Sequence, residues 1–473
     1  MHSLTSLKNR YRIFLLNILI LTLTSFLGVI TALEPFKIFY LLLLFLCLAF
    51  YYFKDYYPNT FILIILLSLT SSNFIQMVFL QLGLIKQGTF LSSIVYYFPI
   101  LITWIGSFLL LKENLTRELN VTRVDIIALI ILLYLLLIGL LSPKPYGYDV
   151  FIMSFLRFSL FIPAYFLGRM LFRFNFRYLN SILFFLTVII AVIGILDVLT
   201  NHKILISSGL GLFIKSNLFE NENATIFYKA GFPRMMSVLV SPLLLGTISS
   251  AFTQYWFFKF ITGNRKYIVP FLISLLILIL TFTRASWISC ILGITVLTFF
   301  FSLKDRYILK IIFVFWIFIL GLILSISIVL ENTNLSSFII DTINGKESSV
   351  SEHIRGLNQG IIAIKENLFF GNGIGNSPYF QVVFGNGFIN FESWYLDSIF
   401  SAGIIFILGF HLLAITGISR VQGYYRILLI SWFLTFSFES VINHSWYQSL
   451  PVLIFWTTLG YLVSQTKENK NRS

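Results

Sequence analysis

The sequence predicts an all-α fold: a polytopic transmembrane helical bundle of about 14 spans, with a large external loop that contains an amphipathic helix. Composition is the first reason, because 58% of the 473 residues are hydrophobic and only 11% are charged, against roughly a quarter charged in a soluble domain. The second reason is that the apolar residues gather in long runs, and the third is that basic residues lie between alternate runs. So much apolar surface requires contact with lipid.

Apolar runs of roughly 17 to 25 residues are long enough to be spans. The first run follows Lys8, Arg10 and Arg12 in the manner of a signal peptide, but no small-residue cleavage site follows it, so we interpret it as a membrane helix. The run 267–303 is too long for one span, and we divide it at Thr283 and Arg284, because a charge at mid-bilayer is costly. The expected spans are 13–33, 37–53, 60–81, 90–111, 125–142, 150–170, 178–198, 235–258, 267–282, 285–303, 309–330, 393–416, 426–439 and 446–464.

The basic residues predict the orientation of these spans. In a soluble protein, the net charge of +14 would favour a nucleic-acid partner. Here the positive-inside rule accounts for it, because most of the 33 Lys and Arg residues fall in short loops on one side, as Arg169, Arg173 and Arg177 do. We therefore expect a multi-pass protein of the bacterial cytoplasmic (inner) membrane with both termini cytoplasmic, and no nucleic-acid partner.

The chain as a whole, residues 1–473, is expected to form a single integral membrane domain. Its spans occupy 13–330 and 393–464, and two external segments are longer than the other connections, at 200–233 and 331–392. Long loops of this kind are often functional. Cys47 and Cys290 both lie in apolar runs, so neither a disulfide framework nor a metal cluster is expected.

The second external loop is predicted to contain an amphipathic helix over 350–367. Apolar residues recur there at helical spacing, while charged and amide side chains occupy the other faces. Such a helix would lie on the membrane surface or cap a cavity. Two glycine-rich turns follow at 371–376 and 385–387. No strand precedes the first of them, which excludes a nucleotide-binding loop.

Three arginines lie at the outer ends of expected spans. Arg234 closes the first external loop, and its planar guanidinium suits a phosphate group, although a snorkelling interfacial arginine has the same position. Arg284 stands at the external turn within 267–303, where satisfying carbonyls at a helix break is at least as good an explanation as substrate contact. Arg157 lies near the outer end of the sixth span, where snorkelling is the default interpretation.

Acidic residues near the membrane provide candidates for proton transfer. Glu392 precedes the span 393–416 and is a candidate general base, or simply an acid at a helix N-terminus. Arg355 on the amphipathic helix follows Glu352 by three residues, a spacing that allows a local ion pair. Asp397 and Glu439 lie inside apolar runs, which makes each a functional candidate with an unidentified partner.

The order of several short motifs resembles the O-antigen ligase and Wzy-type polysaccharide polymerase family. The motifs span roughly residues 230–420 and surround the second external loop. They are Arg234-Met235-Met236-Ser237 with Ser241-Pro242, then Thr281-Phe282-Thr283-Arg284-Ala285, then Arg355-Gly356-Leu357, then the stretch 367–375, and finally Glu392-Ser393-Trp394-Tyr395-Leu396 with Ala402-Gly403-Ile404-Ile405.

This resemblance implies a membrane glycosyltransferase that polymerises oligosaccharide repeat units carried on undecaprenyl diphosphate. Transfer takes place on the outer face of the cytoplasmic membrane and inverts the anomeric carbon; the product is a capsular, exopolysaccharide or O-antigen chain. The implied partners are the lipid-linked oligosaccharide, the lipid bilayer, a flippase and a chain-length regulator. No cofactor and no metal are implied.

The resemblance also implies roles for individual residues. Arg234 and Arg355 correspond to the arginines that engage the diphosphate, and Glu392 would take the proton of the acceptor hydroxyl. Ligases commonly have a His followed by Asn at the position of Glu392, so this departure fits a polymerase better than a ligase. The expected substrate-binding residues are Arg284, Arg157, His353, Gln359, Gly373 and Gly375.

Three alternatives remain open at this point. The first is ligase-type transfer of the glycan to another acceptor. The second is a flippase or another transporter of the lipid-linked oligosaccharide, since many spans and a cationic cavity suit that class too. Transporters tend to show repeated halves and broken helices, and neither is expected from this sequence. The third is a membrane scaffold without catalysis.

Overall fold

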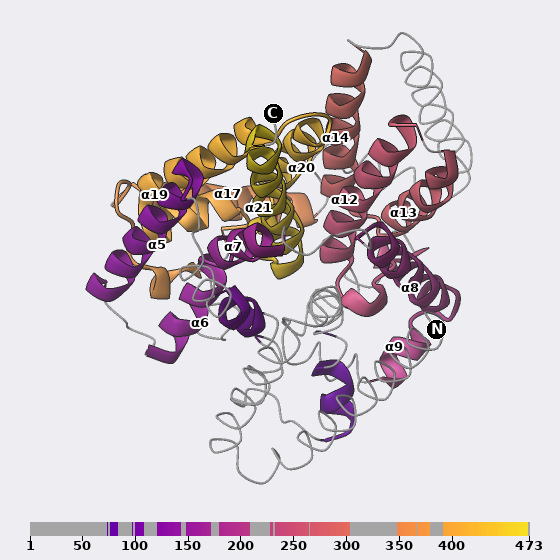
Figure 1. The fold of residues 1–473 in the computed structure, drawn as a ribbon. Helices are drawn as coiled ribbons and strands as arrows, with labels where there is room; N and C mark the ends of the chain where they lie inside the picture. Colours follow the sequence, from indigo (N-terminus) through magenta and orange to yellow (C-terminus); the bar gives the residue numbers. More distant parts are fainter. Residues whose placement is uncertain are drawn as a thin grey trace.

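The computed structural model is an assembly of packed helices (Figure 1). It describes residues 121–142, 148–171, 179–208, 228–229, 232–263, 265–302, 348–365, 367–378 and 391–471, with scattered positions between 73 and 107. The expected spans 13–33, 37–53 and 309–330 lie outside the described residues, as do most of 60–81 and 90–111. The only strands in the described part are β1 (Tyr228–Lys229) and β2 (Phe232–Pro233), an antiparallel pair of two residues each.

One group of helices contains α5 (Arg123–Leu141), α6 (Tyr148–Phe158), α7 (Phe161–Leu171), α19 (Trp394–Arg420) and α21 (Ser449–Asn471). Helices α7 and α21 approach closely because a glycine faces backbone on each side. A Cβ on Gly168 would lie 2.0 Å from the carbonyl oxygen of Thr457, and one on Gly460 would lie 2.1 Å from that of Tyr165. Small residues at such crossings are typical of helix pairs in membranes.

A second group contains α8 (Leu179–Leu199), α12 (Pro242–Ile261), α13 (Ile268–Leu280) and α14 (Arg284–Ser302), and α20 (Tyr425–Glu439) packs against both groups (Figure 1). The interface of α12 with α20 is polar. Gln254 accepts a hydrogen bond from Ser431 Oγ (2.7 Å) and donates one to Thr435 Oγ1 (2.9 Å). Side-chain hydrogen bonds of this kind join helices within membranes.

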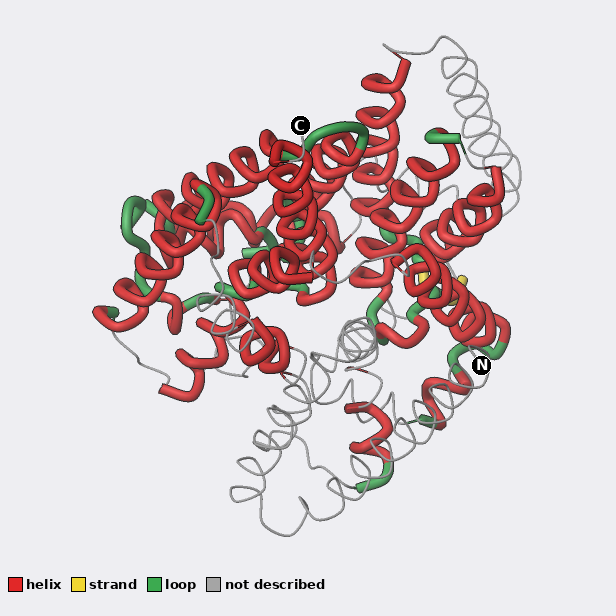
Figure 2. Tube along the Cα trace, viewed as in Figure 1, coloured by secondary structure: helices red, strands yellow, loops and turns green. Residues whose placement is uncertain are grey.

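Short elements connect these helices (Figure 2). They are α9 (Lys203–Ser207), η1 (Ser237–Leu239), η2 (Arg265–Tyr267), η3 (Ile374–Asn376) and η4 (Ser445–Tyr447), and a longer helix, α17 (Ser348–Ala363), precedes η3. Helix α17 confirms the helix expected over 350–367. It begins at Ser348 and ends at Ala363, so both of its bounds lie slightly earlier in the chain than expected.

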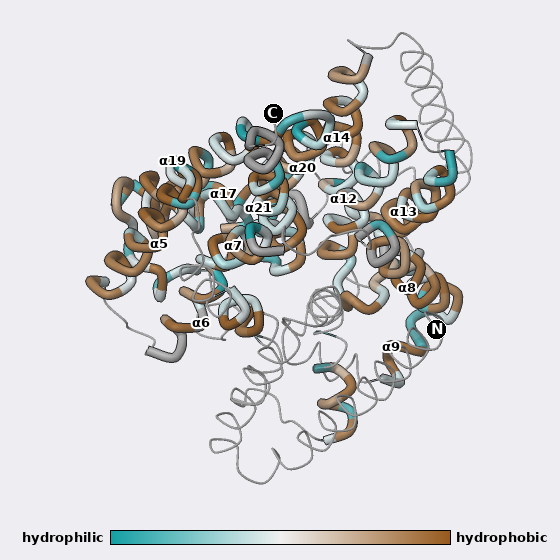
Figure 3. The backbone as a smooth tube through the Cα atoms, in the orientation of Figure 1, coloured by the Kyte–Doolittle hydropathy of each residue, from teal (hydrophilic) through white to brown (hydrophobic). Residues whose placement is uncertain are grey.

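In the described part of the chain, three helices are long and apolar enough to cross a membrane: Arg123–Leu141, Arg284–Phe301 and Trp394–Arg420. The tube is predominantly hydrophobic along α5 and α8 (Figure 3). On α5, Ile126, Ile130, Leu133, Leu137 and Leu140 are all exposed. An exposed apolar stripe of this length suits lipid rather than water.

Several spans differ in detail from the expectation. The expected span 150–170 consists of two helices, α6 and α7, separated at Ser159 and Leu160. Helix α12 begins only at Pro242, because 235–241 is irregular apart from η1. The division of the run 267–303 is confirmed, since α13 ends at Leu280 and α14 begins at Arg284.

Helix α19 is interrupted at Gly403, which has φ 77° and ψ 170°. The glycine-rich stretch 367–373 packs against this break and bonds to its backbone. The amide of Asn372 donates to the carbonyl of Phe400 (2.6 Å), and the amide of Ile404 donates to the carbonyl of Leu368 (2.9 Å). The loop therefore satisfies polar groups that the interruption exposes, as a membrane environment requires.

The helix ends meet at two opposite ends of the bundle. At one end, which we call the basic end, Arg169 of α7 pairs with Asp125 of α5 (3.1 Å), and Lys259 of α12 donates to the hydroxyl of Tyr425 at the start of α20 (2.6 Å). At the other end, which we call the site end, lie the starts of α14 and α19, the end of α20 and the stretch 371–378.

Candidate functional site

The site end brings Glu392 and His353 together from separate elements. His353 lies on α17, and Glu392 immediately precedes Ser393, the N-cap residue of α19. Oε2 of Glu392 lies 3.0 Å from Nδ1 of His353, and the two side chains are 29% and 45% exposed. Glu392 has φ 56°, a left-handed conformation that is uncommon for a residue other than glycine. Such strain persists only where surrounding structure enforces it, and it clusters at functional sites.

Arg157 reaches the same end of the bundle from α6. Its side chain is 5% exposed, and its Nε donates to the carbonyl of Tyr447 in η4 (2.8 Å). It is therefore a buried arginine rather than one that snorkels to the headgroups. The ring of Tyr447 stacks on that of His444, with centroids 5.8 Å apart.

The pKa values of two of these groups follow from their surroundings. Burial alone raises the pKa of Glu392, but the hydrogen bond from His353 and the charges of His353 and His444 outweigh it, so the pKa lies below the ordinary 4.5. Burial lowers the pKa of His444 from 6.5 to about 4; Arg157 and His353 add to this effect and Glu392 opposes it. At neutral pH the carboxylate is therefore ionised and His444 is neutral.

Asp397 joins three elements at this end. It lies in the first turn of α19, where a carboxylate is favoured by the helix dipole. Its Oδ2 accepts from the hydroxyl of Tyr447 (2.5 Å) and from Ser377 Oγ (2.7 Å), just after η3. Tyr447 and Ser377 are thus partners of Asp397 that the sequence did not identify. Through them the carboxylate holds η4 and the end of η3 against α19.

Arg234 and Arg284 lie apart from these groups, at the junction of α13 and α14. Arg234 is 8% exposed. Its Nε donates to the carbonyl of Thr281 (3.0 Å), and Nη2 donates to Thr283 Oγ1 (3.2 Å). The side chain therefore caps the end of α13, a structural task that the sequence assigned to Arg284, the first residue of α14.

Glu439 connects this junction with η4. The carboxylate is fully buried at the end of α20, where it accepts from Ser286 Oγ of α14 and from Ser445 Oγ of η4 (3.3 Å). Ser445 directly follows His444. These hydrogen bonds thus link the region of Arg234 to His444, which interacts electrostatically with Glu392.

The remaining predicted residues divide between surface and interior. Arg355 and Gln359 are exposed on α17, so within the described part of the chain neither is buried as Arg157 and His444 are. Gly373 and Gly375 lie beside the end of α5 and the start of α6. A Cβ on Gly373 would lie 2.2 Å from that of Ser142, which makes close packing the observed role of this glycine.

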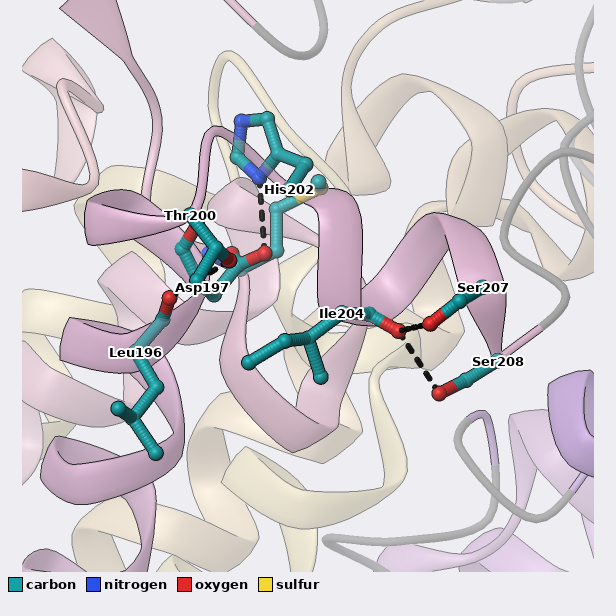
Figure 4. Close-up of polar contacts among 8 residues, drawn as sticks. Leu196, Asp197, Thr200, His202, Ile204, Ser207 and Ser208 are labelled. Carbon is teal, nitrogen blue, oxygen red and sulfur yellow. Dashed lines mark hydrogen bonds and ion pairs between the residues drawn. The ribbon is translucent and has the colours of Figure 1, made fainter.

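Sequence reasoning missed two histidines. His444 lies in the short link between the spans 426–439 and 446–464, and the available signal was its position beside Glu439 in a polar interruption of apolar sequence. His202 was missed as well: its Nδ1 lies 2.9 Å from Oδ1 of Asp197, and both side chains are almost completely buried (Figure 4).

The pair of Asp197 and His202 supports the segment that carries Arg234. Oδ2 of Asp197 accepts from the amide of Met236 (3.3 Å), two residues beyond Arg234. Asn201 and His202 both have positive φ values, so the turn after α8 is strained into this arrangement. The signal for this pair was an acidic residue at the end of an apolar run.

Among the described residues, no group of three or more His, Cys, Asp and Glu side chains is placed to hold a metal ion. Comparison with known families matches residues 269–411 to O-antigen ligase. The matched part contains α17, the glycine-rich stretch and Glu392, while Arg157, Arg234 and His444 lie outside it. No curated protein matches the chain. The match confirms the resemblance drawn from the sequence and supports a membrane enzyme of the glycosyltransferase type.

Proposed function

From the match of residues 269–411 to the O-antigen ligase family, we propose that this membrane protein elongates a glycan by inverting transfer of an oligosaccharide from undecaprenyl diphosphate. The observation that carries the proposal is the convergence of His353, Glu392, Arg157 and His444 at the site end. These residues come from α17, the start of α19, α6 and the link after α20, and two of them lie in the matched segment.

The reaction needs a proton acceptor for the attacking hydroxyl and positive charge for the leaving diphosphate. The pair of Glu392 and His353 supplies the proton acceptor. Arg355, which is exposed on α17 two residues beyond His353, is the cation that we assign to the diphosphate. Arginine suits that task because its planar fork donates paired hydrogen bonds to phosphate oxygens.

Arg234 and Arg284 contribute a second cationic region at the start of α14. Arg234 already caps the end of α13, so the same side chain would serve both the helix end and the diphosphate. The contacts through Ser286, Glu439 and Ser445 hold this region in a fixed relation to His444. We assign no step to a metal or to a nucleotide.

Elongation by purified protein tests this function. Detergent-solubilised protein is mixed with undecaprenyl-diphosphate oligosaccharide without nucleotide or metal, and the products are separated on a gel. We expect a ladder of longer glycans, lost at least 100-fold in Arg355→Ala. Arg426→Ala removes a matched exposed arginine at the basic end and should elongate normally. Full elongation by Arg355→Ala would contradict the assignment.

A ligase would give no ladder with the donor alone but would transfer glycan once its own acceptor is added. One observation favours a second function, transport of the same lipid: the interruption of α19 at Gly403, which the sequence did not predict. The loop 367–373 occupies this break with its own backbone, however, which is a reason to prefer the enzyme. Translocation of the labelled lipid in liposomes without elongation would establish the transporter.

A further inference from the structure

Glu392 and His353 differ in how well they suit the removal of a proton. A general base works best when its pKa lies near the working pH. The pKa of Glu392 is lowered instead, so its carboxylate is a weak base. The imidazole of His353 is also the more accessible group of the pair, at 45% exposed against 29%.

The geometry points to His353 as the proton acceptor of the glycosyl transfer proposed above, with Glu392 as the positioning residue that holds its ring. Nδ1 of His353 faces the carboxylate at 3.0 Å. In this assignment the proton of the neutral ring lies on Nδ1, next to the carboxylate, and Nε2 is the nitrogen that receives the hydroxyl proton. This assignment rests on the proposed function.

The proposed step balances as a simple displacement. The proton of the acceptor hydroxyl passes to Nε2 of His353 as the hydroxyl oxygen forms a bond with the anomeric carbon. The bond from that carbon to the phosphate oxygen breaks, and its electron pair leaves with the undecaprenyl diphosphate. The ring becomes an imidazolium, stabilised through Nδ1–H by Glu392, and later releases its proton to water.

The surroundings of the pair support this division of roles. His444, from the link after α20, interacts electrostatically with both Glu392 and His353; Arg157 of α6 acts on His444, and Arg355 lies on the same helix as His353. His444 is neutral at working pH, because its pKa is about 4. The negative charge of Glu392 therefore stabilises an imidazolium at His353.

Steady-state elongation by His353→Gln, with and without added imidazole, tests the assignment. We expect a 100- to 10,000-fold loss of turnover, retained binding of the donor by thermal shift, and partial recovery with imidazole. His411→Gln is the matched control, because His411 is also half-buried and hydrogen-bonded, to the carbonyl of Ile407 on α19. It should elongate within about twofold of the parent protein, far from the range of a missing base.

The pH dependence of turnover separates positioning from direct catalysis. Glu392→Gln should retain a fraction of activity and shift the acidic limb of the profile to lower pH, because the imidazolium loses its neighbouring charge. This readout does not depend on the folding of a His353 variant.

Two results would overturn the assignment while leaving elongation in place: His353→Gln with turnover within threefold of the parent, or Glu392→Gln without measurable turnover beside an active His353→Gln. The second result would make Glu392 the base. A parent protein that never elongates its donor would instead remove the proposed function itself.

Discussion

At the scale of single residues, burial controls the charges at the site end. Burial raises the pKa of Glu392, but the hydrogen bond from His353 opposes it and the carboxylate is ionised at neutral pH; His444 is neutral there because burial dominates its pKa. Both groups have pKa values below their ordinary ones, so the folded protein binds fewer protons than the unfolded chain in acid. Stability therefore rises with pH wherever the unfolded chain binds the additional protons.

His444 is expected to make the protein acid-sensitive. Its contribution to stability is fully present above the unfolded pKa of 6.5 and is lost as the pH falls toward about 4, a loss of up to about 3 kcal/mol. Thermal midpoints of the detergent-solubilised protein should fall over this range and fall less in His444→Gln. Equal acid sensitivity of the two proteins would contradict the burial argument. His411→Gln provides the control histidine.

At the scale of secondary-structure elements, the relation between α19 and the stretch 367–373 determines the form of the site end. A Cβ on Gly403 would lie 1.9 Å from the carbonyl oxygen of Phe369, and one on Gly371 would lie 2.6 Å from the amide nitrogen of Ala402. The two chains therefore approach at backbone distance. The hydroxyl of Tyr134 on α5 also donates to the carbonyl of Ala402 (2.6 Å), so α5 helps to satisfy the break.

Gly403→Ala should destabilise the protein by at least about 2 kcal/mol, because a φ of 77° with a ψ of 170° belongs to a region used essentially by glycine alone. The measurement is the denaturant midpoint in detergent, followed by elongation activity. Gly409→Ala is the matched control on α19, since its Cβ would meet only the Ile131 side chain, at 3.2 Å. Similar midpoints for both variants would mean that the break is not needed.

At the scale of the whole molecule, the ends of the described helices gather at the basic end and the site end. Ser464 Oγ of α21 donates to the carbonyl of Arg169, and Tyr424 stacks on Phe301 of α14, so the ends expected on one side of the membrane meet. The site end carries Glu392 and the exposed side chains of α17. The function requires that this end face the outside, where the lipid-linked donor is presented.

Cysteine labelling in intact cells tests this orientation. In a background with Cys47 and Cys290 replaced by serine, a cysteine at the exposed Asn358 of α17 should react with a membrane-impermeant maleimide. A cysteine at Gln422, which is also exposed but lies between α19 and α20, should react only after the cells are permeabilised. The reverse pattern would place the site on the cytoplasmic side and rule out the proposed donor presentation.

The sequence determined the helices that apolar runs and turn residues specify locally. It predicted α5, α8, α14 and α20 to within two or three residues at most ends, because a span needs only length and hydropathy. It also divided 267–303 correctly, since an arginine resists mid-bilayer burial. It selected Glu392 and Arg157 as candidates from their residue type and their position near the ends of spans, and His353 as a substrate-binding residue that the resemblance implies.

Only the tertiary structure decided which of these residues meet. The break at Gly403 depends on a loop about thirty residues away that supplies the missing backbone partners, and periodicity within α19 carries no trace of it. The pairing of Glu392 with His353 and the burial of Arg157 beneath Tyr447 likewise come from contacts between distant segments. Hydropathy determines that a helix enters the membrane, whereas side-chain chemistry across helices determines which charges become neighbours and thus their pKa values.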